Sequence, residues 1–413
     1  MNVDVRRRSG RAIAGLSALV LAGMLGTTAC ASDDSEGNAA DAAPTSALPS
    51  DAAQGDPVKI GFVSTEGGAV VSLPEMREGA EAAVQYINNN GGGLAGRPIE
   101  LVVCKQQEEP TSATACANQF VEEQVAAVLS PGTSQGPAIV PIVIGASIPY
   151  VTLNGVAPIE LTSPDVASLS AGLSGTLTAA ATAAQQEGMQ KFTMFASDGG
   201  GIAGMIDQMG KPIFQAFGVD LTVVPIPLGT PDPTPVVTAG LSDNPDGMSF
   251  IGDAATCTSV LKTVQTTAPT LKKVLIPTCL DENVVKAVGI DSVQGNIGIT
   301  ATDYLSDRPD AVLYRSVFAR YAPDLSVTGY GSSGYQTVMA LTAATDGITG
   351  DVNAASIRDA LRTAQNVEMP AGGGITFTCD GSAFPMMPSI CSNQMLIGEI
   401  NDQGIPENLT VTG

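Results

Sequence analysis

The sequence predicts an α/β fold with two doubly wound parallel-sheet lobes. Short apolar segments typical of buried strands alternate with longer segments typical of helices, which is the order of a parallel sheet covered by helices on both faces. This alternation begins a second time near residue 176. The chain has 413 residues, of which 44% are hydrophobic, so it is long enough to build more than one core.

One stretch shows the strand–loop–helix pattern most clearly. Residues 125–129 are apolar and partly β-branched, as expected of a strand buried on both faces. The loop 130–136 follows, and its glycines let the backbone turn sharply and come close to a ligand. Thr133 and Ser134 bring hydroxyl groups beside the unpaired N–H groups of the next helix. Such a combination attracts carboxylates and other anions.

The other elements of the first half follow from the same periodicities. Residues 73–90 are predicted as a helix, because Pro74 suits a first turn and apolar residues recur on one face as far as Ile87. The Asn- and Gly-rich run that follows ends this helix. The expected strands are 58–63, 99–104, 125–129 and 149–152, and the remaining helices are 111–123 and one that begins after Gly136.

The second half repeats the pattern. Its expected strands are 191–196, 221–226, 248–251, 273–276 and 297–300, and its expected helices are 176–187, 202–217, 235–241 and 254–267. Three further helices and two late strands follow, at 310–321, 330–346, 353–363, 375–379 and 394–400. The chain thus contains two similar α/β halves.

The N-terminus has the pattern of an export signal. A basic region with four arginines precedes the apolar stretch Ala12–Gly26, which is too short to span a bilayer comfortably. Thr27-Thr-Ala-Cys30 resembles a bacterial lipobox in its last two residues. We therefore expect a signal peptide over 1–29 and lipidation of Cys30; the alternative is an ordinary signal peptide followed by a chance cysteine. Residues 30–56 lack an apolar period and are predicted to form a flexible linker.

Composition argues against several classes of function. The formal net charge of −22 is unsuited to binding nucleic acid or an anionic membrane surface.

Gly132–Gly136 matches G-x-S-x-G, the nucleophile elbow of α/β-hydrolases. A serine nucleophile needs a base, normally histidine, and the chain contains none. We therefore predict a protein that is not an enzyme and needs no cofactor; a hydrolase with Ser134 as nucleophile and an ordinary structural turn are the alternatives.

The cysteines predict disulfides. Apart from Cys30 they are six, an even number in an exported chain. Locality along the chain favours the pairs Cys104–Cys116, Cys257–Cys279 and Cys379–Cys391 among the possible connectivities. A zinc site is the rival interpretation, and the absence of histidine and of any C-x-x-C spacing disfavours it. No metal is therefore expected.

The candidate ligand site follows from the fold, because open α/β sheets bind ligands at the carboxyl ends of their strands. The loops expected there are small, polar and rich in glycine. In the first half they offer the hydroxyl groups of Ser64, Thr133, Ser134 and Thr152, and in the second half the carboxylates of Asp198 and Asp253. Such an arrangement would hold a zwitterion, with Thr133 and Ser134 on its anionic end. Helix capping explains Asp253 equally well, and it is the favoured interpretation of Asp198.

Several segments together resemble a known family. They are Val58-Lys-Ile-Gly-Phe, Arg77-Glu-Gly-Ala-Glu-Ala-Ala, Ile87-Asn-Asn-Asn-Gly-Gly, Gly96-Arg-Pro-Ile-Glu-Leu and Ile148-Pro-Tyr-Val. From residue 57 onward the chain resembles the type I periplasmic solute-binding proteins of ABC transporters, in the branched-chain amino acid (Leu/Ile/Val-binding) group. The resemblance implies two lobes joined by a three-strand hinge near Gly172–Gly175, Thr300–Tyr304 and Cys391–Gln394. It implies an N-terminal lobe of 57–173 plus 303–391 and a C-terminal lobe of 174–302 plus 392–413.

The same resemblance implies a function. The chain would capture a small polar ligand, an amino acid or a related carboxylate or amide, by hinge closure outside the cell. It would act as a lipid-anchored monomer at the outer face of the cell membrane and deliver the ligand to ABC permease subunits. A sensor domain of the same fold, not coupled to transport, is the alternative.

The family's ligand contacts match specific positions of this sequence. They fall on Gly132–Ser134 and Thr152–Asn154 in the first lobe, which adds Asn154 to the candidate site, and near Asp198, Asp253 and Thr278 in the second. The sequence departs from the family's pattern in three places: Gly199-Gly200 replace a usual tyrosine, Asp253 replaces a frequent aromatic residue, and the acidic position falls at Thr278-Cys279.

Overall fold

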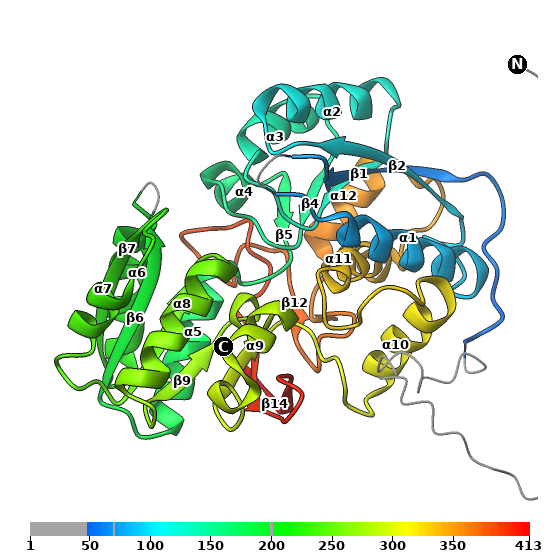
Figure 1. Ribbon diagram of the computed structural model, residues 1–413. Helices are drawn as coiled ribbons and strands as arrows, with labels where there is room; N and C mark the ends of the chain where they lie inside the picture. The colour runs from blue at the N-terminus through cyan, green and yellow to red at the C-terminus, as the bar shows by residue number, and fades with distance from the viewer. Residues whose placement is uncertain (1–47, 69–70, 199–200) are drawn as a thin grey trace, which may run out of the picture. The chain divides into compact units, whose positions relative to one another are not determined.

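The computed structural model describes residues 48–413 except 69–70 and 199–200 (Figure 1). The predicted signal peptide, the lipidation site Cys30 and most of the predicted linker lie outside the described residues. The described end of that linker is held against the domain, where Ala53 N–H donates to the Asn88 carbonyl at 2.9 Å. Among the described helices, none combines the length and the hydropathy of a membrane span.

The first sheet has five parallel strands in the order β2-β1-β3-β4-β5. They are β1 (Val58–Thr65), β2 (Ile99–Gln106), β3 (Ala127–Ser130), β4 (Tyr150–Thr152) and β5 (Val166–Ser168). The helices that connect them are α1 (Pro74–Asn89), α2 (Pro110–Glu122), α3 (Gly136–Gly145) and the short α4 (Pro158–Thr162). The sequence analysis did not predict β5 or α4, because such short segments carry no measurable period.

Both faces of this sheet are covered by apolar side chains, as the doubly wound arrangement requires. Successive residues of a strand point to opposite faces. Accordingly Leu129 belongs to the core under α1, and its neighbour Val128 to the core under α2 and α3. The first of these cores also contains residues of three helices that come after the fifth strand of the second sheet in the sequence: α10 (Pro309–Tyr321), α11 (Gly331–Thr345) and α12 (Ala354–Thr363).

The second sheet has seven strands in the order β14-β13-β10-β9-β8-β6-β7. Five are parallel: β6 (Lys191–Asp198), β7 (Asp220–Pro227), β8 (Gly247–Ile251), β9 (Lys272–Leu275) and β10 (Ile297–Thr300). The helices of this half are α5 (Gly172–Gln186), α6 (Ile202–Ala216), α7 (Thr234–Gly240), α8 (Ala254–Thr267) and α9 (Glu282–Val288).

Two antiparallel strands complete the second sheet, β13 (Met395–Ile400) and β14 (Pro406–Thr412). The edge strand β14 was not predicted, because its exposed polar residues give no apolar pattern. The strand predicted at 375–379 is only partly present: β12 (Thr376–Phe377) pairs with β11 (Val367–Glu368) in a separate two-stranded sheet.

The chain passes from one sheet to the other three times: between β5 and α5, between β10 and α10, and just before β13. Side-chain hydrogen bonds involve residues of the second and third connecting segments. The Gln336 side-chain amide donates to the Ala301 carbonyl at 3.0 Å, and Thr376 N–H donates to the side-chain oxygen of Gln394 at 2.8 Å. The architecture is thus an α/β fold with two mainly parallel sheets.

The cysteine pairs expected from locality are bonded in the structure: Cys104–Cys116, Cys257–Cys279 and Cys379–Cys391, with Cα–Cα distances of 5.5, 5.7 and 4.3 Å. The first ties β2 to α2, and the second ties α8 to the 3-10 helix η3 (Pro277–Leu280). The first bond therefore ties down the segment after the carboxyl end of β2, and the second ties down the segment after the carboxyl end of β9.

Candidate ligand-binding site

The predicted first-half residues lie at one edge of the first sheet, at the carboxyl ends of β1, β3 and β4. Ser64 is inside β1 rather than in the loop after it, because β1 continues to Thr65. Thr133 and Ser134 lie between β3 and α3, and Thr152 ends β4. Since β1, β3 and β4 are neighbours, the sheet order brings these residues to a common edge.

The hydroxyl groups of Thr133 and Ser134 are occupied by a carboxylate of the protein itself. Thr133 Oγ1 donates to Glu108 Oε1 at 2.7 Å. Ser134 donates to Glu108 Oε2 through its N–H, at 3.1 Å, and through its hydroxyl. The loop therefore binds an anion, as its composition indicates, but in this structure the anion is a glutamate side chain.

Glu108 reaches this position from the loop that follows β2. Oε1 also accepts hydrogen bonds from the Gln106 side-chain amide at 2.6 Å and from the Thr65 hydroxyl at 3.1 Å. Partial burial by itself would raise the pKa of Glu108, but the hydrogen bonds from Ser134, Gln106 and Thr133 outweigh it and hold the pKa below its usual value. The carboxylate is thus stabilised in its charged form.

Ser64 also donates to a glutamate, at the carboxyl end of β1. Its hydroxyl lies 2.8 Å from Glu66 Oε1. Two cations hold the same carboxylate, Arg77 of α1 at 2.5 Å and Lys105 of β2 at 2.7 Å. Burial would raise the pKa of Glu66, whereas these hydrogen-bonded partners lower it, and the net shift is downward. The negative charge at this position is therefore neutralised locally.

A third glutamate touches the start of α3. Glu160 is fully buried and accepts hydrogen bonds from the Tyr150 hydroxyl at 3.1 Å and from the N–H of Ala157 at 3.0 Å. A methyl group on Gly136, the first residue of α3, would lie 2.5 Å from the Glu160 carboxyl carbon, so a larger residue there would have to displace the Glu160 side chain. Burial raises the pKa of Glu160, although backbone hydrogen bonds oppose the shift.

The last two first-half candidates differ in their contacts. The Thr152 hydroxyl is fully buried and has no hydrogen-bond partner among the described residues. Asn154 is exposed, and its side-chain oxygen accepts a hydrogen bond from the Ser170 hydroxyl at 2.8 Å. Asn154 is thus the more accessible of the two.

In the second half both aspartates bind helix starts. Asp198 accepts hydrogen bonds from the N–H groups of Gly201 and Ala203, at 3.1 and 3.4 Å, at the beginning of α6. Asp253 is the N-cap of α8 and accepts from Thr256 N–H at 2.8 Å. Burial would raise the pKa of Asp253, but hydrogen bonds, chiefly from Thr256, lower it. The capping interpretation accounts for both side chains as they stand.

The sequence profile of the periplasmic binding protein family matches residues 57–404. The chain belongs to this family. No curated protein sequence matches this periplasmic binding protein. The family is non-catalytic, which agrees with the absence of a histidine partner for Ser134 in the sequence.

Solved structures share the fold at low sequence identity. A leucine-binding protein from Thermotoga maritima has a TM-score of 0.67 and 18% identity, and the match covers 86% of this chain and 98% of that one. A branched-chain amino acid transporter substrate-binding protein from Streptococcus pneumoniae, in complex with isoleucine, has a TM-score of 0.66 and 17% identity, and the match covers 86% of this chain and 99% of that one. An ABC transporter solute-binding protein from R. palustris, in complex with 4-hydroxybenzoate, has a TM-score of 0.68 and 19% identity, and the match covers 87% of this chain and 96% of that one.

The sequence analysis missed three glutamates of this periplasmic binding protein: Glu66 and Glu108, which accept hydrogen bonds from predicted donors, and Glu160, which lies beside the start of α3. A signal for Glu108 was present: the polar run Lys105–Glu109 directly follows a predicted strand. That strand was ended at Cys104, two residues early, so the run was not counted among the loops at the strand ends. Glu160 had no comparable signal, because it lies on the unpredicted helix α4.

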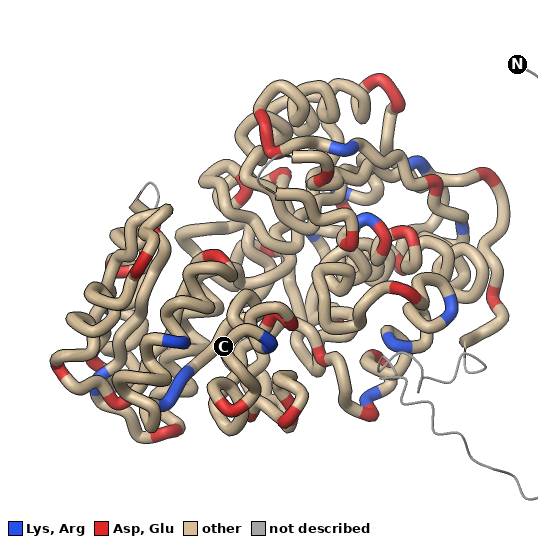
Figure 2. The backbone as a smooth tube through the Cα atoms, in the orientation of Figure 1, with Lys and Arg blue, Asp and Glu red and all other residues tan. Residues whose placement is uncertain are grey.

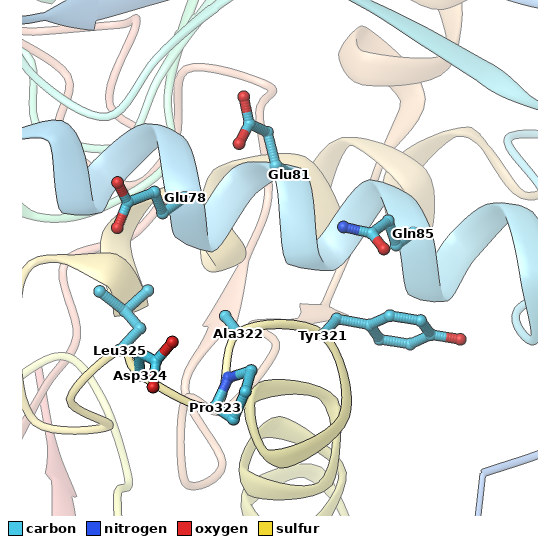
Figure 3. Close-up of a pocket in the computed structure, with 8 residues that line it drawn as sticks. All are labelled: Glu78, Glu81, Gln85, Tyr321, Ala322, Pro323, Asp324 and Leu325. Atoms are coloured by element: carbon cyan, nitrogen blue, oxygen red, sulfur yellow. The ribbon is translucent and has the colours of Figure 1, made fainter. Parts of the chain in front are cut away.

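Two hollows of the described surface lie away from these loops. One, of about 250 Å³, lies between α1 and the residues that follow α10 (Figure 3), and none of its lining residues is a predicted site residue. It is lined by Glu78, Glu81, Gln85, Tyr321, Ala322, Pro323, Asp324 and Leu325. Acidic residues are spread over many elements of the chain (Figure 2). Among the described residues no group of side chains is suited to hold a metal ion.

Proposed function

We propose that this periplasmic binding protein is the extracytoplasmic solute receptor of an ABC importer. It captures a small polar ligand by hinge closure between an N-terminal lobe of 57–173 plus 303–391 and a C-terminal lobe of 174–302 plus 392–413. The family match over 57–404 carries this proposal. The named ligands of the structural neighbours, isoleucine and 4-hydroxybenzoate, support a solute of that size.

The proposed contacts lie in the loops at the carboxyl ends of the strands. The first lobe contributes the loop Thr133–Ser134, with Ser64, Thr152 and Asn154 around it, and the second contributes Asp198 and Asp253. A capping aspartate keeps lone pairs free on its carboxylate, so capping and ligand contact are compatible in one side chain. The proposed partners are ABC permease subunits, and the proposed membrane attachment is a lipid on Cys30.

Ligand-induced thermal shift and calorimetric titration test the proposal. The panel comprises amino acids, small carboxylates and amides, with small-angle scattering to detect closure of the lobes. We expect at least one class to raise the melting temperature and to reduce the radius of gyration. Ser134→Ala should weaken binding about tenfold to a hundredfold, because its hydroxyl holds the Glu108 carboxylate in this loop and a hydrogen bond to a charged group contributes about 1.5–3 kcal/mol.

Ser259→Ala is the matched control, because Ser259 is a partly exposed residue of α8 whose hydroxyl bonds, among the described residues, only to the Ala255 carbonyl of its own helix. If no class of solute binds the wild-type protein, the receptor function is wrong. If solutes bind but Ser134→Ala and Ser259→Ala both behave like wild type, the receptor function survives and the assignment of the Thr133–Ser134 loop fails. Uptake of the bound solute by cells that lack the protein separates transport from sensing.

A further inference from the structure

We propose that Glu108 is a specificity-determining residue, whose negative charge makes the first lobe select cationic ligand groups, such as ammonium or guanidinium, over carboxylates. This inference rests on the proposed function, because it assigns the ligand chemistry of the same loops. It reverses the expectation that Thr133 and Ser134 bind the anionic end of a ligand.

The first step of the argument is that the donors of the loop are already used. Thr133 and the N–H and hydroxyl of Ser134 all donate to Glu108. Gln106 and Thr65 donate to it as well. These five donors fill the roughly four lone-pair sites of the Glu108 carboxylate, so Glu108 acts on a ligand through its charge and not as a free hydrogen-bond acceptor. A ligand carboxylate could use the same donors only by displacing Glu108.

The second step is that Glu108 is held from its backbone as well as from its side chain. Its N–H donates to the side-chain oxygen of the buried Gln106 at 2.7 Å, and its carbonyl accepts from the Gln135 side-chain amide at 3.1 Å. The backbone of Glu108 has a φ of 56°, a left-handed conformation that few residues other than glycine adopt. Displacement would therefore require rearrangement of the loop and not only rotation of one side chain.

The third step concerns charge. Among the described residues no lysine or arginine forms an ion pair with Glu108, whereas Glu66 has two such partners. The buried carboxyl group of Glu160 also touches Gly136 at the start of α3. The positive end of that helix therefore already faces protein carboxyl groups, and an incoming anion meets their repulsion. A cation meets attraction, and Glu108 is only partly buried.

Chemical rescue tests whether the Thr133–Ser134 loop is an anion site filled by Glu108. This experiment does not require the natural ligand to be known. Glu108→Ala removes the carboxylate and leaves its donors. We expect a lowered melting temperature that millimolar acetate or formate raises in a saturable way, while chloride at equal ionic strength does not. Wild type and Glu109→Ala should not respond, because the Glu109 side chain makes no capping hydrogen bond. A Glu108→Ala protein that melts like wild type, or that ignores acetate, overturns the inference.

Selectivity is measured by calorimetry on two matched series of probes: leucine, leucinamide and 4-methylpentanoate, and phenylalanine, phenylalaninamide and 3-phenylpropanoate. We expect wild type to bind the amides, which are cations through their protonated amine, at least about tenfold more tightly than the carboxylates without an amine, and Glu108→Gln to reduce this ratio at least about tenfold. Glu109→Gln, which removes the same charge one residue away, should leave the ratio unchanged.

The outcomes separate the two proposals. Wild-type preference for the carboxylates, or a ratio that Glu108→Gln leaves unchanged, overturns the inference and leaves the receptor function standing. Failure of wild type to bind any probe of either series or of the wider panel overturns the receptor function. The acetate experiment reports on the loop in either case.

Discussion

The closest helix contact on the first sheet gives a quantitative prediction. A methyl group at Gly334 of α11 would lie 1.7 Å from the carbonyl oxygen of Met76 in α1, and 3.0 Å from the backbone nitrogen of Ala80. Non-bonded heavy atoms in contact are normally about 3.5 Å apart, so Gly334→Ala must push the helices apart by on the order of 2 Å. The obstacle is backbone, which no side-chain rotation relieves.

Inserting a methylene into a well-packed core typically costs about 1–3 kcal/mol, and a clash with backbone belongs at the upper end of that range. We therefore expect Gly334→Ala to lower the free energy of unfolding by about 3 kcal/mol or more. With a urea dependence of about 3 kcal/mol per molar, the unfolding midpoint followed by circular dichroism should fall by about 1 M or more.

The matched control is Gly204→Ala. Gly204 is an exposed residue of α6, and a methyl group there would meet no atom of the described residues within 4 Å, apart from the backbone of its own helix. Replacing such a helical glycine should stabilise the protein by about 0.4–1 kcal/mol. If Gly334→Ala unfolds at the wild-type urea concentration, or if the two variants lose equal stability, the close packing of α1 on α11 is wrong.

Three further predictions concern single residues. Burial raises the folded-state pKa of Glu160 above its ordinary value of 4.5, so its contribution to stability is complete below pH 4.5 and is lost as pH rises through the folded-state pKa. In urea titrations, Glu160→Gln should therefore gain stability relative to wild type on going from pH 4.5 to 7. A stability difference that stays constant over this pH range would contradict the shift. Asp253→Ala should lower the free energy of unfolding by about 0.5–2 kcal/mol as the loss of an N-cap does; an additional loss of ligand affinity would show that the side chain also contacts the ligand, and unchanged stability would refute the cap. Cys30→Ala should release the protein from cell membranes or leave it unprocessed, and unchanged retention in membrane fractions would refute the lipid anchor.

Local sequence patterns determined most of the fold. Apolar period, glycine-rich loops and helix starts are properties of neighbouring residues, so the strand–helix alternation of both sheets could be predicted from them. The disulfides were predictable for the same reason, since each joins cysteines 12 or 22 residues apart. The elements that escaped prediction are short, such as β5, or exposed and polar, such as β14, and their stability comes from neighbouring strands rather than from their own pattern.

The sequence by itself also determined that the loop Thr133–Ser134 is built to bind a carboxylate. Only the tertiary structure decided which carboxylate it binds here. Glu108 follows β2 and contacts the loop that follows β3. The two are close because only one strand, β1, separates β2 from β3 in the sheet. No local pattern encodes that order, since it results from the crossover connections and from the burial of both faces. The same reason explains the covering of the first sheet by α10, α11 and α12, which the chain reaches only after completing most of the second sheet.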